Sequence, residues 1–268
     1  MINAALKNRG LIRDFVSRDF KARFAGSILG VTWNVINPLV MILIYIVIFS
    51  RVMRAKLPGV PSKYGYSIYL CSAIIPWVMF VELLNRYTNL FFEHGNMIKK
   101  VNFPRETLHI SAMITGTINF FISFSIFMFF LAILHLSGLH EVQIGFERML
   151  LLFVILGFQQ LFCLGLGFGF SVLNVFFRDV GQFVGIISQL WFWFTPIVYP
   201  LAVVPGALKK FYVLNPMYHF MKIYRSILYL NQNPEWNTVG LVIVTAIFTF
   251  LIGFLIYRKL RDGITDEI

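Results

Sequence analysis

The side chains of this chain that could take part in chemistry are cations and aromatic rings rather than catalytic groups. The 268 residues include 23 Lys and Arg, 12 Asp and Glu, and 17% aromatic residues. No Walker A, HExxH or GxSxG motif is present. Cys71 and Cys163 lie in apolar stretches without CxxC spacing, so we expect buried packing and no metal site. The net charge of +11 favours contact with anionic lipid headgroups over nucleic acid, for which there is no recognition motif.

Aromatic and basic side chains alternate between Pro205 and Trp236, in a segment too polar to span a membrane. We expect two short helices here that dip into the membrane interface and break at Asn215-Pro216. Aromatic rings at an interface often serve only as an anchoring belt. The apolar C–H faces of sugars also stack on rings, so a path for a glycan is the alternative.

Glycines recur in Gly165-Leu-Gly-Phe-Gly169, where a phosphate-binding loop could be suspected. No Lys-Ser/Thr follows, and the surrounding sequence is apolar. Gly165 and Gly169 instead form a GxxxG pair, which predicts close approach of two helices.

Six apolar stretches must position these groups, and each is long enough to cross a bilayer of ~30 Å as a helix. They are Val31–Ser50, Tyr66–Val81, Leu108–His135, Met149–Val175, Val180–Val204 and Val239–Tyr257. With 58% hydrophobic and 13% charged residues, the composition is that of an integral membrane protein. We predict an all-α fold in one transmembrane domain, residues 1–268, with spans one to five in 31–204, span six in 239–257 and a tail in 258–268.

Charge sets the expected orientation. Residues 1–30 carry six bases and two acids, so the positive-inside rule places this end in the cytoplasm. Six spans then bring the C-terminus to the same side. The start does not have the pattern of a signal peptide, because charge recurs through Arg23.

Residues 8–27 have the pattern of an amphipathic helix lying on the membrane. Ile12, Val16 and Phe20 follow i, i+4 spacing. Asp19 and Arg23 project into the apolar side, and we expect them to pair with each other because they are four residues apart.

Ion coupling is not favoured, because ionisable groups inside the spans are scarce. If the protein moves a substrate uphill, the energy is expected to come from another subunit.

Four blocks of sequence carry a resemblance to a known family. They are Arg18–Trp33 running on to Asn37-Pro-Leu39, then Phe176-Phe-Arg-Asp179, Phe194-Thr-Pro-Ile-Val-Tyr-Pro200 and Leu214-Asn-Pro-Met-Tyr218. In this order they resemble the transmembrane permease subunit of type-2 ABC transporters that export polysaccharide, the O-antigen, capsule and teichoic acid exporters. The similarity extends from about Arg9 to Arg261.

The resemblance implies a homodimer in the bacterial inner membrane with two separate ATPase subunits, which bind ATP and Mg. The chain itself would be no enzyme and hold no cofactor. The substrate would be a polysaccharide on a polyprenyl diphosphate lipid, moved outward. Residues 8–27 would cradle the ATPase, 93–105 would form a coupling and gate region, and 205–236 would form outer re-entrant helices.

The resemblance also implies roles for individual residues. Candidates to bind the lipid diphosphate or gate its entry are the cations Arg9, Arg13, Lys99, Lys100 and Arg105. Candidates to line the glycan channel are Trp33, Asn37, Trp191, Trp193 and Tyr199. Candidates to couple to the ATPase are Arg18, Lys21, Met97, Ile98, Arg178 and Asp179. Candidates for an outer gate are Tyr212, Tyr218, His219 and Tyr224.

Three alternatives remain open. The chain could belong to an ABC exporter of a drug or small lipid, to a membrane enzyme acting on polyprenyl-linked sugars, or to an ion-coupled flippase. The sugar, and the choice among O-antigen, capsule and teichoic acid, are not specified by these residues.

Overall fold

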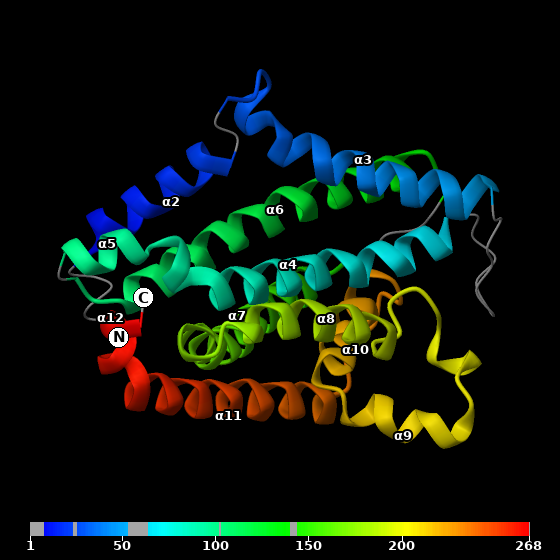
Figure 1. Cartoon of the computed structure of the whole chain (residues 1–268). Coiled ribbons are helices and arrows are strands. Elements are labelled where there is room, and N and C mark those ends of the chain that lie inside the picture. The colour runs from blue at the N-terminus through cyan, green and yellow to red at the C-terminus, as the bar shows by residue number, and fades with distance from the viewer. Residues whose placement is uncertain (1–7, 24–25, 53–63, 102, 140–143, 268) are drawn as a thin grey trace.

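The structure is a computed structural model that describes residues 8–23, 26–52, 64–101, 103–139 and 144–267. These residues form helices, turns and loops without a strand, so the all-α prediction is confirmed for this part of the chain. The helices are α2 (Arg9–Arg23), α3 (Trp33–Val47), α4 (Gly65–Glu93), α5 (Gly95–Lys100), α6 (Glu106–Leu136), α7 (Phe146–Phe176), α8 (Asp179–Phe194), α9 (Gly206–Leu214), α10 (Pro216–Leu228), α11 (Trp236–Leu260) and α12 (Ile264–Glu267) (Figure 1).

Among the described residues, five helical stretches are long and apolar enough to cross a membrane. They are Gly30–Ser50, Gly65–Glu93, Glu106–Leu136, Phe146–Phe176 and Trp236–Gly263. They correspond to the predicted first, second, third, fourth and sixth spans. Long apolar stretches become helices in lipid because a helix satisfies its own backbone hydrogen bonds.

The predicted fifth span, Val180–Val204, is not one continuous helix. α8 has 16 residues and ends at Phe194. Thr195, which precedes Pro196, has φ −108° and ψ 120°, the extended conformation that proline favours in the residue before it. At 1.5 Å per residue α8 is ~24 Å long, short of a hydrocarbon core of ~30 Å. A sixth span therefore stays a prediction.

α4 is the centre of the bundle. Over its most apolar stretch 83% of the residues are buried, against 11% for the stretch that contains α3. α4 packs against α6, α7, α8 and α10, while α3 lies along the outside over α6 and α4 (Figure 1). The bundle therefore leaves the faces of α3 largely without a partner from this chain.

α7 and α11 make the most extensive helix pair in the bundle. A Cβ on Gly165 would lie 2.6 Å from the backbone of Phe250, and a Cβ on Gly253 would overlap the carbonyl of Gly165. Close approach at Gly165 is thus confirmed, with α11 as the partner helix. Gly169 is looser, since its added Cβ would lie 4.0 Å from the Cα of Gly253.

α2, α5 and α12 lie together at one end of the bundle, which we call the terminal end (Figure 1). The ring of Phe15 on α2 packs 5.8 Å from the rings of both His94 and Phe103. Ile12 and Phe15 are buried, whereas Arg9, Arg13, Arg18 and Lys21 are exposed. An amphipathic α2 is therefore observed over Arg9–Arg23.

The expected pairing of Asp19 with Arg23 is wrong. Asp19 accepts two hydrogen bonds from Arg86 of α4, at 2.5 and 2.8 Å. Arg23 pairs with Glu82 of α4 at 2.5 Å. Both charges face α4 and find opposite charges there, so two ion pairs join α2 to the central helix.

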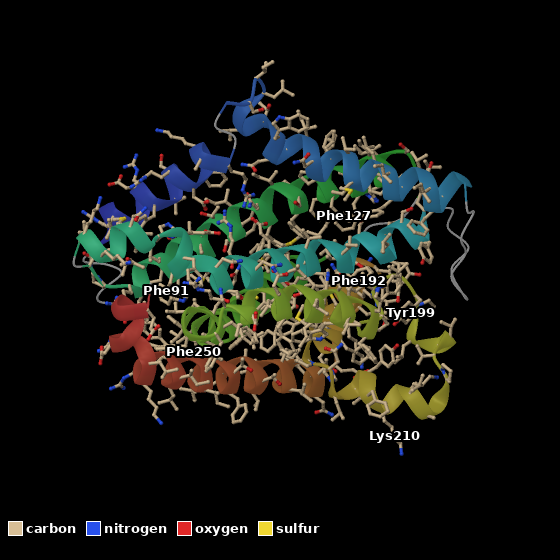
Figure 2. The ribbon with its side chains drawn as sticks, viewed as in Figure 1. Phe91, Phe127, Phe192, Tyr199, Lys210 and Phe250 are labelled. Carbon is tan, nitrogen blue, oxygen red and sulfur yellow. The ribbon has the colours of Figure 1, made fainter. Side chains whose placement is uncertain are left out.

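The opposite end, which we call the distal end, holds the segment after α8 together with α9 and α10 (Figure 1). The two short helices expected in 205–236 are present, and they break at Asn215-Pro216. Entry of these helices into a membrane stays a prediction. Lys210 on α9 points away from the bundle (Figure 2).

Candidate functional site

A cavity of about 460 Å³ lies between α4 and α8. Its walls combine aromatic rings with amide and hydroxyl groups, and they are formed by Trp77, Val81, Asn85, Gly185, Ser188, Gln189, Phe192 and Trp193. The ring centroids of Trp77 and Phe192 are 5.8 Å apart, and those of Phe192 and Trp193 are 5.4 Å apart. Ring faces bind apolar C–H surfaces, and amides bind hydroxyl groups. This α4–α8 cavity can therefore accommodate a ligand that has both kinds of surface.

One wall of this cavity is formed by α8, a helix that the rest of the chain scarcely covers. Of its 16 residues only Val184 and Ser188 are buried. Ile186 and Trp193 are 60% and 61% exposed. An apolar face that its own chain leaves exposed contacts either lipid or another protein chain.

At the distal end one amide group holds three segments together. Asn215 accepts a hydrogen bond from the indole of Trp191 at 2.7 Å and donates to Phe194 O and Thr195 Oγ1, both at 2.9 Å. Its oxygen also accepts from the Met217 amide at 3.0 Å, which caps the start of α10. The end of α8 is thereby fixed to the start of α10.

Arg225 of α10 holds the backbone that follows α8. Its guanidinium donates to the carbonyls of Pro196 and Ile197, each at 2.6 Å, and stacks 3.7 Å from the ring centroid of Tyr69. Burial lowers the pKa of Arg225 to about 10, so the side chain stays charged at neutral pH. Tyr69 adds a 3.0 Å hydrogen bond to the carbonyl of Tyr199, and Tyr66 bonds that of Val198. The backbone carbonyls that follow α8 lie outside a helix, and these side chains supply their hydrogen bonds instead.

The predicted glycan-channel residues fall into four places. Trp193 lines the α4–α8 cavity. Trp191 packs inward, with its ring centroid 5.1 Å from that of Phe80. Tyr199 lies at the distal end, where its hydroxyl bonds the carbonyl of Trp193 (Figure 2). Trp33 and Asn37 line a separate groove between α3, α4 and α6.

The predicted outer-gate residues divide between the distal end and the core. The hydroxyl of Tyr212 lies 2.9 Å from that of Tyr199. His219 bonds the carbonyl of Val213 at 2.7 Å. Tyr218 is half-buried, with its ring 5.1 Å from that of His219. Tyr224 is 1% exposed and donates to Gln159 at 2.8 Å, so it belongs to the core.

The predicted lipid-diphosphate residues share the terminal end but lie on different elements (Figure 1). Arg9 and Arg13 are exposed on α2, and Lys99 and Lys100 are exposed at the end of α5. Arg105 donates to the carbonyl of Arg261, so it is engaged within the chain.

The predicted ATPase-coupling residues occupy the same end. Two of them, Arg18 and Lys21, are exposed on α2. On α5, Met97 is half-buried and Ile98 is 7% exposed within the core, so Ile98 anchors α5. Arg178 lies over the ring of Phe92 at 6.0 Å, and Asp179 is exposed at the start of α8.

Sequence reasoning gave no role to Asn215, Arg225, Glu82 or Arg86. Asn215 did carry a signal, because asparagine directly before proline is a helix-starting pair. Arg225 and Glu82 gave none, since their partners lie far away in the sequence. No group of His, Cys, Asp and Glu among the described residues could hold a metal ion.

Several known proteins are similar in sequence to this chain over most of its length. The chain is 27% identical over 270 residues to the O-antigen export system permease protein RfbA of Myxococcus xanthus, covering 100% of this chain and 99% of that protein. It is 27% identical to a protein of the same name from Klebsiella pneumoniae, covering 91% and 90%. It is 21% identical to the polysialic acid transport protein KpsM of Escherichia coli, covering 92% of each. Residues 11–229 match the model of the ABC-2 type transporter family. The chain is a multi-pass membrane protein that belongs to the ABC-2 type transporter family.

Proposed function

We propose that this chain is the permease subunit of an ATP-driven exporter that moves a polyprenyl-diphosphate-linked polysaccharide across the inner membrane, from the cytoplasmic side outward. The names of its relatives, O-antigen export permease and polysialic acid transport protein, support a polysaccharide substrate. The chain has no nucleotide-binding motif, so two separate ATPase subunits bind ATP and Mg and supply the energy.

The α4–α8 cavity is the observation that carries the proposal. Trp77, Phe192 and Trp193 offer ring faces next to the amides of Asn85 and Gln189. A sugar polymer has apolar C–H faces and hydroxyl groups on every unit, so such a surface binds each unit weakly and lets the polymer slide. A small apolar drug would make little use of the amides.

Two copies complete the pathway. In one copy the α4–α8 cavity is open on the uncovered side of α8. A twofold contact through this face of α8 encloses a channel between the two cavities.

The two ends of the bundle take different roles. The terminal end, with the exposed cations of α2 and α5, faces the cytoplasm, where it meets the ATPase and the lipid diphosphate. Both termini lie on this side. The distal end, where Tyr199 bonds Tyr212, closes the channel toward the outside.

The test removes one ring from the cavity. Trp193→Ala in the full exporter should lower surface polysaccharide by about fivefold, because a lost ring contact of ~1 kcal/mol weakens binding to that extent. Trp193→Tyr, which keeps a ring, should retain most export. The matched control is Phe129→Ala, which removes a ring that is 68% exposed on the outside of α6. Surface polysaccharide and protein abundance would be measured together.

Normal polysaccharide in Trp193→Ala, or an equal loss in Phe129→Ala, would contradict the role of the cavity. Export that continues when the ATPase is inactivated would contradict the proposed energy source.

A further inference from the structure

A second cavity of about 430 Å³ lies on the other side of α4, in the groove between α3, α4 and α6. Figure 1 shows α3 crossing over α6 and α4 at this place. The groove has a polar end and an apolar wall, and its volume is within the usual range of ~300–1,000 Å³ for a ligand site. The proposed export function makes no use of this groove beyond Trp33 and Asn37.

The polar end is formed around one acid and one base. Arg23 pairs with Glu82 at 2.5 Å, and the amide of Asn119 donates to the same Glu82 oxygen at 2.8 Å. Arg86 is engaged with Asp19 beside them. The four charged groups of this cluster sum to zero, so the site favours neither a net anion nor a net cation.

Two polar atoms of the groove have no partner among the described residues. They are Nδ2 of Asn34, a donor, and Oδ1 of Asn119, an acceptor, and both are buried. Because the Asn119 nitrogen already donates to Glu82, its oxygen must face elsewhere. Buried polar groups in folded proteins are almost always hydrogen-bonded. The groove thus has one donor and one acceptor to offer to a ligand headgroup.

The rest of the groove is an apolar wall that follows α3 and α4. It is formed by Pro38, Met41, Ile42, Ile74, Ile75 and Val78. Met41 and Val78 remain 52% and 56% exposed, so the wall is open toward the membrane. A hydrocarbon chain that enters from the side would cover these residues while its headgroup stays at the polar end.

We infer that this groove binds one phospholipid with a zwitterionic phosphoethanolamine headgroup. Its phosphate accepts hydrogen bonds from Arg23 and Asn34, and its ammonium donates to Glu82 and Asn119. One acyl chain lies along the apolar wall. A polyprenyl diphosphate or an anionic lipid has no ammonium for Glu82 and would bring excess negative charge beside that carboxylate, so the site rejects them.

The inference is independent of which polymer the protein exports. Arg23 belongs both to the groove and to the ion pairs that join α2 to α4. A lipid bound here therefore contacts the helix that faces the proposed ATPase and the central helix at once.

The experiment titrates the purified full-length chain in detergent with phosphatidylethanolamine, phosphatidylglycerol and a polyprenyl diphosphate, and counts bound lipid by native mass spectrometry. Phosphatidylethanolamine should bind about tenfold more tightly than the other two, as one charge-assisted hydrogen bond would provide. Glu82→Gln removes the negative charge and should reverse the preference toward phosphatidylglycerol.

A matched pair of variants tests the location. Met41→Trp should fill the groove and abolish the preference, whereas Leu43→Trp should not, because Leu43 is 50% exposed on α3 but does not line the groove. Equal or tighter binding of phosphatidylglycerol or polyprenyl diphosphate by the unaltered chain would overturn the inference. So would equal effects of the two tryptophan variants.

Discussion

The side chain of Asn215 makes four hydrogen bonds to three segments, and its position shows how single residues hold the distal end. It contacts Trp191, the Phe194–Thr195 turn and the first turn of α10. In an Asn215→Ala protein the Trp191 indole, the Phe194 carbonyl and the Met217 amide would lose these bonds, whereas the Thr195 hydroxyl would keep its bond to the Trp191 carbonyl.

We therefore expect Asn215→Ala to lower the free energy of unfolding by about 3 kcal/mol, the sum of lost bonds and buried groups without partners. Thermal unfolding in detergent would measure it. Asn237→Ala, at an exposed position in the first turn of α11, should change stability little. Similar losses in both proteins would mean that the Asn215 hydrogen bonds contribute nothing specific.

Individual residues are also where sequence reasoning succeeded least. Tyr224 sits among aromatic and basic residues in the sequence, which favoured a gate, yet it faces Gln159 in the core. Arg225 lies in a segment with the composition of an interfacial anchor, but its guanidinium stacks on Tyr69 and donates hydrogen bonds to two backbone carbonyls. The first outcome depends on α10 packing against α7 and the second on α10 packing against α4, and both are contacts between segments that are distant in the sequence.

At the scale of elements, two ion pairs link α2 to α4, while α2 packs most extensively against α6. Asp19 and Arg86 form a two-bonded pair, and their side chains are only 33% and 16% exposed. The pairs therefore connect α2 to the helix that lines both cavities, and we expect them to couple the two helices during export.

Reversing the charges of this pair tests the connection. Asp19→Arg alone and Arg86→Asp alone should each reduce export, because they place like charges together. The double variant should recover most of it, with a coupling free energy of about 1–3 kcal/mol. Asp14→Arg is the control, since it makes the same charge change at an exposed site of α2. Failure of the double variant to improve on either single variant would show that the pair does not transmit motion.

The α7–α11 contact makes a second prediction for elements. Gly253→Ala should destabilise the protein by about 1–3 kcal/mol, because its methyl group would overlap the Gly165 carbonyl. Gly240→Ala on the same helix has nothing within 4 Å and should be neutral or stabilising. Melting temperatures of the two proteins would be compared. A tolerated Gly253→Ala would mean that the helices separate at little cost.

Elements were predicted best where hydropathy alone decides. Glu106–Leu136 and Phe146–Phe176 contain the stretches expected as spans three and four. The end of α8 was missed, because the sequence stays apolar through Val204 while the helix stops at Phe194. The turn depends on Pro196 and on side chains from α4 and α10, which donate hydrogen bonds to the backbone carbonyls after α8. Because these side chains come from other helices, no local sequence pattern reveals them.

For the whole molecule, the uncovered face of α8 is the expected contact between two copies. Ile186→Cys, near the middle of α8, should form a disulfide-linked dimer on mild oxidation if the twofold axis passes close to it, since a residue near the axis faces its own copy. Cys71 and Cys163 are buried and should not interfere. Leu255→Cys on α11, at a position 61% exposed against 60% for Ile186, should stay monomeric. Gel electrophoresis without reductant gives the readout, and a dimer through Leu255→Cys alone would place the interface elsewhere.

Helices of very different length stand side by side in this bundle. The 29 residues of α4 correspond to ~44 Å, whereas the 16 residues of α8, which packs against α4, correspond to ~24 Å. A helix shorter than the hydrocarbon core is accommodated when the bilayer beside it thins or when it joins other helices. In the exporter that we propose, a hydrophilic polymer following α8 would then meet a dry barrier several ångströms thinner than the surrounding membrane, and its dehydration cost would fall accordingly.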